Sequence, residues 1–208
     1  MPPPRAGSRL RCASSIASVL RALFPIETER LRLRPFDPGD IDGFVAIHTH
    51  PDVPRYLYWG VRSRAELESV LAGKIERAAL ERPGDAVDVA AVVRATGALA
   101  GSVSLTWHDS EHRQGEIGFI FDPAHQGNGY ATEAARALLR VGFEELGLHR
   151  IAGRLDARNA ASARVLERLG MRREAYLVEN ELVKGEWTDE AVYALLAREW
   201  RAQLPRTP

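Results

Sequence analysis

The sequence lacks most of the features that would place it outside ordinary globular proteins. Its single cysteine, Cys12, excludes an intramolecular disulfide framework and a cysteine-rich zinc site. No apolar run reaches the roughly 18 residues that a membrane-spanning helix requires. The 28 basic and 28 acidic residues cancel, so the chain has no overall positive charge to attract nucleic acid. We therefore expect neither a nucleic acid nor a membrane partner, and a cytoplasmic location.

The zero net charge is unevenly distributed along the chain. Residues 1–25 contain four arginines and no acid, which leaves 24 basic and 28 acidic residues, a net charge of −4, in residues 26–208. The first 25 residues are also rich in proline and serine. This composition predicts a basic, disordered N-terminal extension over residues 1–25. It is also typical of an organelle transit peptide, and that alternative stays open. We expect a single domain over residues 26–203.

The hydrophobic pattern after residue 25 predicts a mixed fold. Alternating apolar residues predict strands over residues 31–36, 87–94, 98–107, 114–121, 151–155, 172–182 and 187–196. Helical spacing and capping residues predict helices over residues 40–49, 63–80, 131–146 and 160–169. Short turns join the three strands between residues 87 and 121, which favours an antiparallel meander. The expected fold class is α+β, with a mostly antiparallel sheet of about seven strands and about four flanking helices.

The most informative segment joins the predicted strand 114–121 to the predicted helix that follows it. A loop that contains Gly127 and Gly129 leads directly into that helix. Glycines allow tight turns, and the first N–H groups of a helix lack internal partners and lie at the positive end of its dipole. The segment therefore predicts a phosphate or pyrophosphate site. A dinucleotide fingerprint needs a third glycine where Thr132 stands, and a dinucleotide-binding oxidoreductase stays as an alternative.

The loop also carries a family motif. Gln126-Gly127-Asn128-Gly129-Tyr130-Ala131 matches Gln/Arg-X-X-Gly-X-Gly/Ala, the acyl-CoA pyrophosphate motif of the GNAT superfamily of N-acetyltransferases. The segments Asn159-X-X-Ser162, Val165-Leu166-Glu167-X-X-Gly170 and Trp187-X-Asp189 agree with it. The chain resembles this superfamily over about residues 26–201. Its segment Thr28–Arg34 resembles the first strand of the RimJ/RimL-type branch, which acetylates protein N-termini.

The resemblance implies a GNAT fold in which two neighbouring strands splay apart, and acetyl-CoA as co-substrate. The strand residues Phe119, Ile120 and Phe121 would run beside the pantetheine arm, with a main-chain N–H near Ile120 polarising the thioester carbonyl. Asn159 would hydrogen-bond the pantetheine amide; as an alternative that is compatible with this role, it caps the helix at 160–169. The pyrophosphate would be held by Gln126, Gly127, Asn128, Gly129, Tyr130, Ala131 and Thr132.

The catalytic residues are assigned by the same resemblance. Glu116 lies at the place where many members have a carboxylate, and we expect it to act as the base; alternatively it is an exposed strand residue. Leu166 stands where many members have a tyrosine acid, so Ser162 is the candidate acid, or else a helix residue that bonds its own backbone. The histidines His108, His112 and His125 show no metal-ligand spacing, and we expect no metal.

The acceptor side would come from the first two helices and the late strands. The resemblance implies acetyl transfer to a primary amine, with the α-amino group of a protein or peptide favoured. A small amine, amino acid or antibiotic is the alternative within the class, and a non-catalytic CoA-binding regulatory protein is the alternative outside it. The expected chain is a monomer or a homodimer. Candidate acceptor residues are Tyr56, Tyr58, Trp59, Asp109, Glu111, Glu179 and Glu181.

Overall fold

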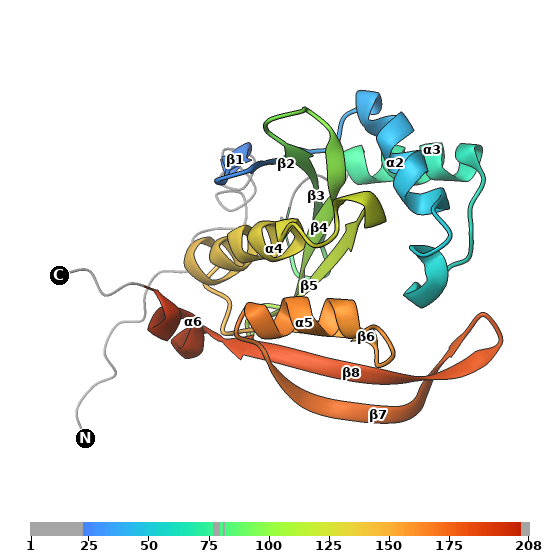
Figure 1. Ribbon diagram of the computed structural model, residues 1–208. Coiled ribbons are helices and arrows are strands. Elements are labelled where there is room, and N and C mark those ends of the chain that lie inside the picture. The colour runs from blue at the N-terminus through green and yellow to red at the C-terminus, as the bar shows by residue number, and fades with distance from the viewer. Residues whose placement is uncertain (1–22, 77–79, 81, 205–208) are drawn as a thin grey trace, which may run out of the picture.

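The computed structural model describes residues 23–76, 80 and 82–204, and its ribbon is drawn in Figure 1. Residues 1–22, most of the predicted extension, lie outside the described residues. The described part forms one sheet in the order β1-β2-β3-β4-β5-β6-β8-β7. Its strands are β1 (Ile26–Glu27), β2 (Leu31–Pro35), β3 (Ala86–Val93), β4 (Leu99–Asp109), β5 (Gln114–Phe121), β6 (Arg150–Asp156), β7 (Arg172–Val183) and β8 (Glu186–Leu196).

The helices cover both faces of the sheet. Helix α4 continues into a π-helical turn, Val141–Glu145, and short 3₁₀ turns lie at Pro38–Asp40, Pro54–Tyr56 and Pro123–His125. In Figure 1, α4 and α5 lie side by side on one face of the sheet, and the long β7–β8 hairpin extends beyond the other strands. The α-helices are α2 (Ile41–Thr49), α3 (Arg64–Glu76), α4 (Tyr130–Arg140), α5 (Ala160–Arg168) and α6 (Ala197–Gln203).

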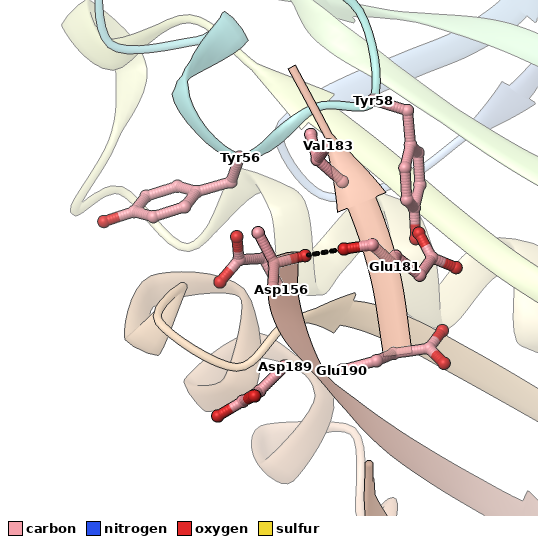
Figure 2. Close-up of a pocket in the computed structure, with 8 residues that line it drawn as sticks. Tyr56, Tyr58, Asp156, Glu181, Val183, Asp189 and Glu190 are labelled. Carbon is pink, nitrogen blue, oxygen red and sulfur yellow. Dashed lines mark hydrogen bonds between the residues drawn. The ribbon is translucent and has the colours of Figure 1, made fainter. Parts of the chain in front are cut away.

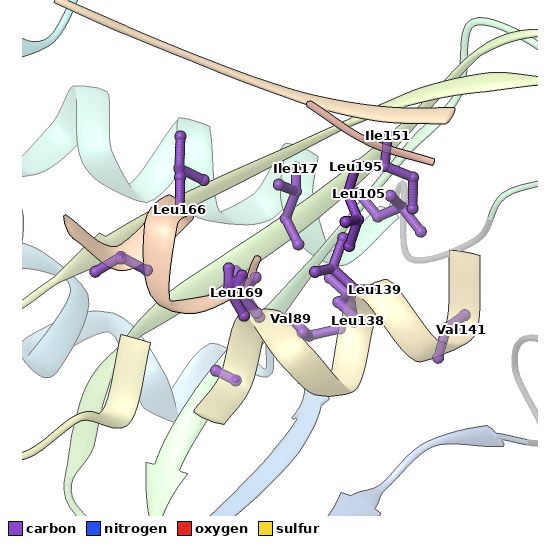
Figure 3. Close-up of a cluster of buried hydrophobic side chains, with 14 of the residues drawn as sticks. Val89, Leu105, Ile117, Leu138, Leu139, Val141, Ile151, Leu166, Leu169 and Leu195 are labelled. Atoms are coloured by element: carbon purple, nitrogen blue, oxygen red, sulfur yellow. The ribbon is translucent and has the colours of Figure 1, made fainter. Parts of the chain in front are cut away.

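Strand β3 shows why the sheet has two apolar faces. Val87, Val89 and Ala91 belong to the larger core under α4 and α5, whereas Ala90 and Val92 belong to a smaller core under α2 and α3. Successive side chains of a strand point to opposite faces, so a strand buried on both faces is a continuous apolar run. Figure 3 shows the larger core, where Leu138 and Leu139 of α4 pack toward the sheet.

The fold confirms the predicted GNAT architecture of a mixed, mostly antiparallel sheet flanked by helices. Each of the seven predicted strands and four predicted helices has its counterpart, though residues 77–79 at the end of the second predicted helix lie outside the described residues. Two short elements are additional. Strand β1 has only two residues, which pair with β2, and α6 follows β8 directly. The meander β2-β3-β4-β5 is antiparallel throughout. Among the described residues, β5-α4-β6 is therefore the one parallel strand–helix–strand unit, whereas a dinucleotide-binding fold is built from a mostly parallel sheet of several such units.

Candidate active site

Strands β5 and β6 form the sheet's one parallel pair among the described residues, and their pairing is incomplete. Gln114, Gly115 and Glu116 pair with Arg150, Ile151 and Ala152, and the register ends there. Both strands nevertheless continue, β5 to Phe121 and β6 to Asp156. The strands therefore splay and leave a wedge-shaped gap between their carboxyl ends. Helix α4 begins after β5 and α5 begins after β6, so both helix N-termini border the mouth of this gap.

The main-chain groups of β5 face the gap at alternate residues. Beyond the strand's end, the N–H of Asp122 donates to the carbonyl of Ala100 at 2.9 Å, toward β4. The register of β5 with β4 is regular over this stretch, and main-chain groups alternate in direction along a strand. The N–H of Ile120 therefore points to β4 as well. The N–H groups that point into the gap are those of Phe119 and Phe121, one residue to either side.

The loop between β5 and α4 presents free main-chain donors. Gly127 and Gly129 adopt φ of +79° and +76°, the left-handed region that glycine enters without strain. The side chain of Asn128 donates to the carbonyl of His125 at 3.1 Å. Within the described residues, none of the N–H groups from Gly127 to Thr132 donates to a main-chain or side-chain acceptor. These donors lie at the N-terminus of α4, where an anion is stabilised.

The side chain of Asn159 caps α5 through its oxygen, and its Nδ2 remains available to a ligand. Its Oδ1 accepts from the main-chain N–H of Ser162 at 3.0 Å, which caps α5. This bond fixes which end of the amide is oxygen, so the Nδ2 donor remains for a ligand carbonyl. Ser162 lies in the first turn of α5 and is partly buried. Leu166 is 2% exposed and packs over Gly153, where an added Cβ would come within 2.9 Å of its Cδ2, so that position serves the core.

Glu116 lies on the opposite face of β5 from the α4 core, with two basic groups beside it. Nε2 of His108 is 3.3 Å and Nε of Arg154 is 3.5 Å from its Oε2. Arg154 also contacts Glu190 through Nη1 at 3.1 Å, and the Glu190 side chain is 3% exposed. Arg154 therefore joins two carboxylates from β5 and β8. Its position was not found from the sequence, because an alternating strand gives no sign of which charged residues meet across it.

A pocket opens beside these carboxylates, and Figure 2 shows the residues that line it. Tyr58 and Glu181 come together there, as the sequence reasoning grouped them, with the Tyr58 ring reaching down to the Glu181 carboxylate. Tyr56 also lines the pocket, but Trp59, Asp109, Glu111 and Glu179 do not. The acceptor candidates from the sequence did not include three acidic residues of the lining, Asp156, Asp189 and Glu190. The lining residues are Tyr56, Tyr58, Asp156, Glu181, Val183, Thr188, Asp189 and Glu190.

Local structure explains how Glu181 reaches the pocket. The register of β7 with β8 shifts between Leu177 and Glu181, and such a bulge re-aims the side chains that follow it. Lys184, at the tip of the β7–β8 hairpin, donates to the carbonyl of Pro54. This contact ties the hairpin tip to the segment that carries Tyr56 and Tyr58. Two chain segments more than a hundred residues apart are thereby held around one pocket.

The charges of the pocket are unequally compensated. Asp156 pairs with Arg158 at 2.7 Å and Glu190 with Arg154. Hydrogen bonds from Tyr176 and from the N–H of Glu179 lower the pKa of Asp189. Within the described residues, no arginine or lysine pairs with Glu181.

The electrostatics of the pocket act on Tyr58 as well. The residue is 55% exposed, but its hydroxyl end lies among carboxylates. Burial of that end, followed by the negative charges of Glu181, Glu190 and Glu116, raises the pKa of Tyr58 to about 12. A tyrosine with such a pKa stays neutral at physiological pH and remains a hydrogen-bond donor. The pocket therefore combines excess negative charge with a neutral phenol whose O–H can donate to a carboxylate while its oxygen accepts from a cation, which suits an ammonium group.

The described part of the chain shows neither a metal-ligand cluster nor a membrane-spanning helix. Across residues 23–76, 80 and 82–204, no three histidine, cysteine or carboxylate side chains are grouped as metal ligands. Over the same residues, no helix combines the length and the apolar character needed to cross a bilayer.

Comparisons with known proteins agree with this geometry. Residues 30–172 match the family model described as an acetyltransferase (GNAT) domain. The chain is 33% identical over 176 residues to the uncharacterized N-acetyltransferase YnaD of Bacillus subtilis, covering 84% of this chain and 98% of that protein. It is 28% identical over 112 residues to the spermidine N(1)-acetyltransferase of Escherichia coli K12, covering 54% of this chain and 60% of that protein. A GNAT-family acetyltransferase structure from Bacillus anthracis superposes with a TM-score of 0.76 and 32% identity, covering 84% and 99% of the two chains.

Proposed function

The chain belongs to the GNAT family of N-acetyltransferases, and we propose that it transfers the acetyl group of acetyl-CoA to the N-terminal α-amino group of a protein or peptide. The observation that carries this proposal is the gap between β5 and β6. The free N–H groups of the loop Gly127–Thr132 border the gap at one side, and an acidic pocket lies beside Glu116 on the other. One side fits an anionic co-substrate and the other fits a cationic acceptor.

The co-substrate side follows from the free donors. The main-chain amides from Gly127 to Thr132 hold the pyrophosphate, with the side chain of Gln126 beside them, and the Nδ2 of Asn159 donates to a pantetheine carbonyl. The pantetheine arm lies along Phe119–Phe121 in the gap. The N–H of Phe119 or Phe121, and not that of Ile120, then stabilises the oxyanion that forms on the thioester carbonyl. This assignment rests on the alternation of β5.

The acceptor side supplies orientation and proton removal. Glu181, which has no cationic partner among the described residues, and Tyr58 hold the ammonium group. Glu116 takes a proton from it, directly or through water. The free amine attacks the acetyl carbonyl carbon, the C–S bond breaks, and the amide and CoA thiol are the products. Ser162, at the start of α5, relays the second proton of the attacking nitrogen: its hydroxyl donates a proton to the leaving thiolate and takes up the proton that the nitrogen loses.

The favoured acceptor rests on the resemblance of Thr28–Arg34 to the RimJ/RimL-type branch and on the pocket's position at the molecular surface, between the hairpin tip and the segment of Tyr56 and Tyr58. A protein terminus can reach such an opening. A small cationic amine is the second candidate, because the pocket has four acidic residues in its lining and a partly matching relative is named as a spermidine acetyltransferase.

An acceptor screen tests the proposal. Release of CoA thiol from acetyl-CoA is measured with peptides that have a free N-terminus, with the same peptides blocked at the N-terminus, and with polyamines, amino acids and aminoglycosides. Lysine-free peptides make the α-amino group the peptide's sole amine. We expect release with free peptides and none with blocked ones. Release with polyamines alone would replace the favoured acceptor by the second. Binding of acetyl-CoA without release by any acceptor would support a non-catalytic CoA-binding protein.

A matched pair of variants connects the screen to the pocket. Glu181→Gln removes the uncompensated charge, and Glu179→Gln changes a neighbouring carboxylate that does not line the pocket. We expect the first variant to raise the KM for the amine about tenfold, the scale of a hydrogen bond to a charged group, and to leave the KM for acetyl-CoA unchanged. The second variant should match the wild type in both constants.

A further inference from the structure

The segment before β2 and the first turn of α4 are joined by a dense set of hydrogen bonds. The carboxylate of Glu133 accepts from the hydroxyl of Thr28 at 2.6 Å, from the main-chain N–H of Arg30 at 2.8 Å and from Nε of Arg30 at 2.8 Å. Nη2 of Arg30 lies 2.6 Å from the same carboxylate. Burial opposes ionisation of Glu133, but these hydrogen bonds outweigh it and lower its pKa. The position of the guanidinium is thus fixed from one side.

The other side of the guanidinium contacts the loop itself. Nη1 of Arg30 donates to the carbonyl of Asn128 at 2.7 Å, and the guanidinium lies over the ring of Tyr130, 5.1 Å from its centroid. The C=O and N–H of one planar trans peptide point in opposite directions. Because Arg30 holds the carbonyl of the Asn128–Gly129 peptide, the N–H of Gly129 points away from Arg30. Gly129 allows this orientation through its φ of +76°.

Neighbouring carbonyls of the loop are held by a side chain as well. The Nδ2 of Asn128 donates to the carbonyl of His125 at 3.1 Å and approaches that of Gln126 at 3.4 Å. Because the carbonyls of His125, Gln126 and Asn128 accept these side-chain hydrogen bonds, the N–H groups of the loop remain available to a ligand. A loop rich in glycine would otherwise sample several peptide orientations, and an oriented set of N–H groups binds an anion more tightly than a mobile set because less entropy is lost on binding.

We propose that Arg30 is a positioning residue for the pyrophosphate of acetyl-CoA: it fixes the Asn128–Gly129 peptide so that the N–H of Gly129 faces the phosphates, and Glu133 holds Arg30 in that place. The inference rests on the proposed CoA site, and it assigns to the segment before β2 a part in co-substrate affinity. The competing explanation is that Arg30 and Glu133 only join the edge of the sheet to α4. That role would affect stability but not the recognition of one part of the co-substrate.

Arg30→Met tests the proposal because it keeps an aliphatic stem and removes every side-chain donor, while the main-chain N–H that donates to Glu133 remains. Arg32→Met is the matched control, since Arg32 lies on β2, is 56% exposed at its side chain and pairs with Glu27 rather than with the loop. The Michaelis constants are measured for acetyl-CoA and for S-acetylpantetheine, which has no pyrophosphate. We expect Arg30→Met to raise the KM for acetyl-CoA about tenfold and to leave the KM values for S-acetylpantetheine and for the amine unchanged. Arg32→Met should match the wild type.

Three outcomes separate the possibilities. The role of Arg30 is overturned if Arg30→Met raises the KM for acetyl-CoA and for S-acetylpantetheine by the same factor. It is also overturned if the KM for acetyl-CoA does not change. A wild-type protein that binds both co-substrates equally well instead contradicts the pyrophosphate site, and with it the proposed function. Arg30→Lys extends the test if Arg30→Met does not fold. A single ammonium group cannot reproduce the forked contacts to Asn128 and Glu133, so we expect its KM for acetyl-CoA to rise while its melting temperature stays close to that of the wild type; an unchanged KM in Arg30→Lys counts against the role.

Discussion

His108 and Glu116 face each other across β4 and β5, with Nε2 of the histidine 3.3 Å from Oε2 of the glutamate. The histidine is about half exposed at its side chain and Glu116 is about one third exposed. Arg154 approaches the same oxygen from β6 at 3.5 Å. The half-exposed imidazole lies between this carboxylate and solvent, where it can exchange a proton with either. The contact is therefore compatible with the proposed role of Glu116 as the base.

Glu116→Gln should lower the rate in a pH-dependent way. At low pH the acceptor is almost entirely an ammonium group, so loss of the base should reduce kcat/KM about 100-fold, within the range for general bases. At pH 9.5 most α-amino groups are already deprotonated, because their ordinary pKa is about 8, and the loss should be less than about tenfold. Glu111→Gln, in the exposed turn between the same strands, is the control. A loss of equal size at all pH values would contradict the role of base.

Tyr58 should remain protonated in alkaline solution. Its pKa is raised to about 12, so Tyr58 should contribute almost no tyrosinate absorbance at pH 10, where a phenol of ordinary pKa is half ionised. The difference between the wild type and Tyr58→Phe measures this directly. The same variant should raise the KM for the amine by a factor that stays constant from pH 7 to pH 10. Tyrosinate absorbance near pH 10 that disappears in Tyr58→Phe would show that the carboxylates of the pocket do not surround the hydroxyl.

The loop should not tolerate a negative side chain. Gly129→Glu adds bulk and a negative charge to the loop that we assign to the pyrophosphate, with its Cβ 3.5 Å from Nη2 of Arg30, and we expect CoA affinity to fall at least about 100-fold. Gly147→Glu is the control. The φ of Gly147 is +66°, close to the +76° of Gly129, and an added Cβ at Gly147 has no atom within 4 Å. Both variants carry the same backbone strain and charge. Equal CoA affinities by calorimetry would exclude the loop as the pyrophosphate site.

The fold and the glycine-containing turn between β5 and α4 were predictable because their signals are local. Alternation along β3, the glycines of the loop and the cap at Asn159 each lie within a few residues of the chain. Strand β1 has two residues, too few for any periodic pattern. The direction of the N–H groups of β5 depends on its register with β4, which is a property of two strands. The sequence thus indicated the neighbourhood of Ile120 but not which neighbouring amide faces the gap.

The acidic pocket that we propose for the acceptor was predictable only in part. Tyr58 and Glu181 were grouped by the resemblance, and they meet. Arg154 and Glu190 were missed, because their contact joins β6 to β8 across the sheet and depends on burial of a carboxylate that a sequence pattern treats as solvent-exposed. Lys184 joins the hairpin tip to Pro54, 130 residues away along the chain. Interactions of this kind depend on tertiary structure, for which no local signal exists.

Asn159 allows its two roles to be separated by two substitutions. Asn159→Ala removes both the cap and the amide donor, so we expect a loss of about 1 kcal/mol of stability, or about 2–4 °C in melting temperature for a chain of this size, together with a higher KM for acetyl-CoA. Asn159→Asp keeps an oxygen for the N–H of Ser162 and loses only the Nδ2 donor. Its melting temperature should match that of the wild type, and its KM for acetyl-CoA should rise about fivefold to tenfold, the scale of one lost hydrogen bond.

The added charge of Asn159→Asp could weaken binding by repelling the phosphates rather than by loss of the donor. S-acetylpantetheine separates these effects, because it keeps the amides of the arm and carries no phosphate. A higher KM with S-acetylpantetheine in Asn159→Asp identifies the lost hydrogen bond to the arm. A wild-type KM with S-acetylpantetheine in a variant of unchanged melting temperature leaves Asn159 as the cap of α5 and nothing more.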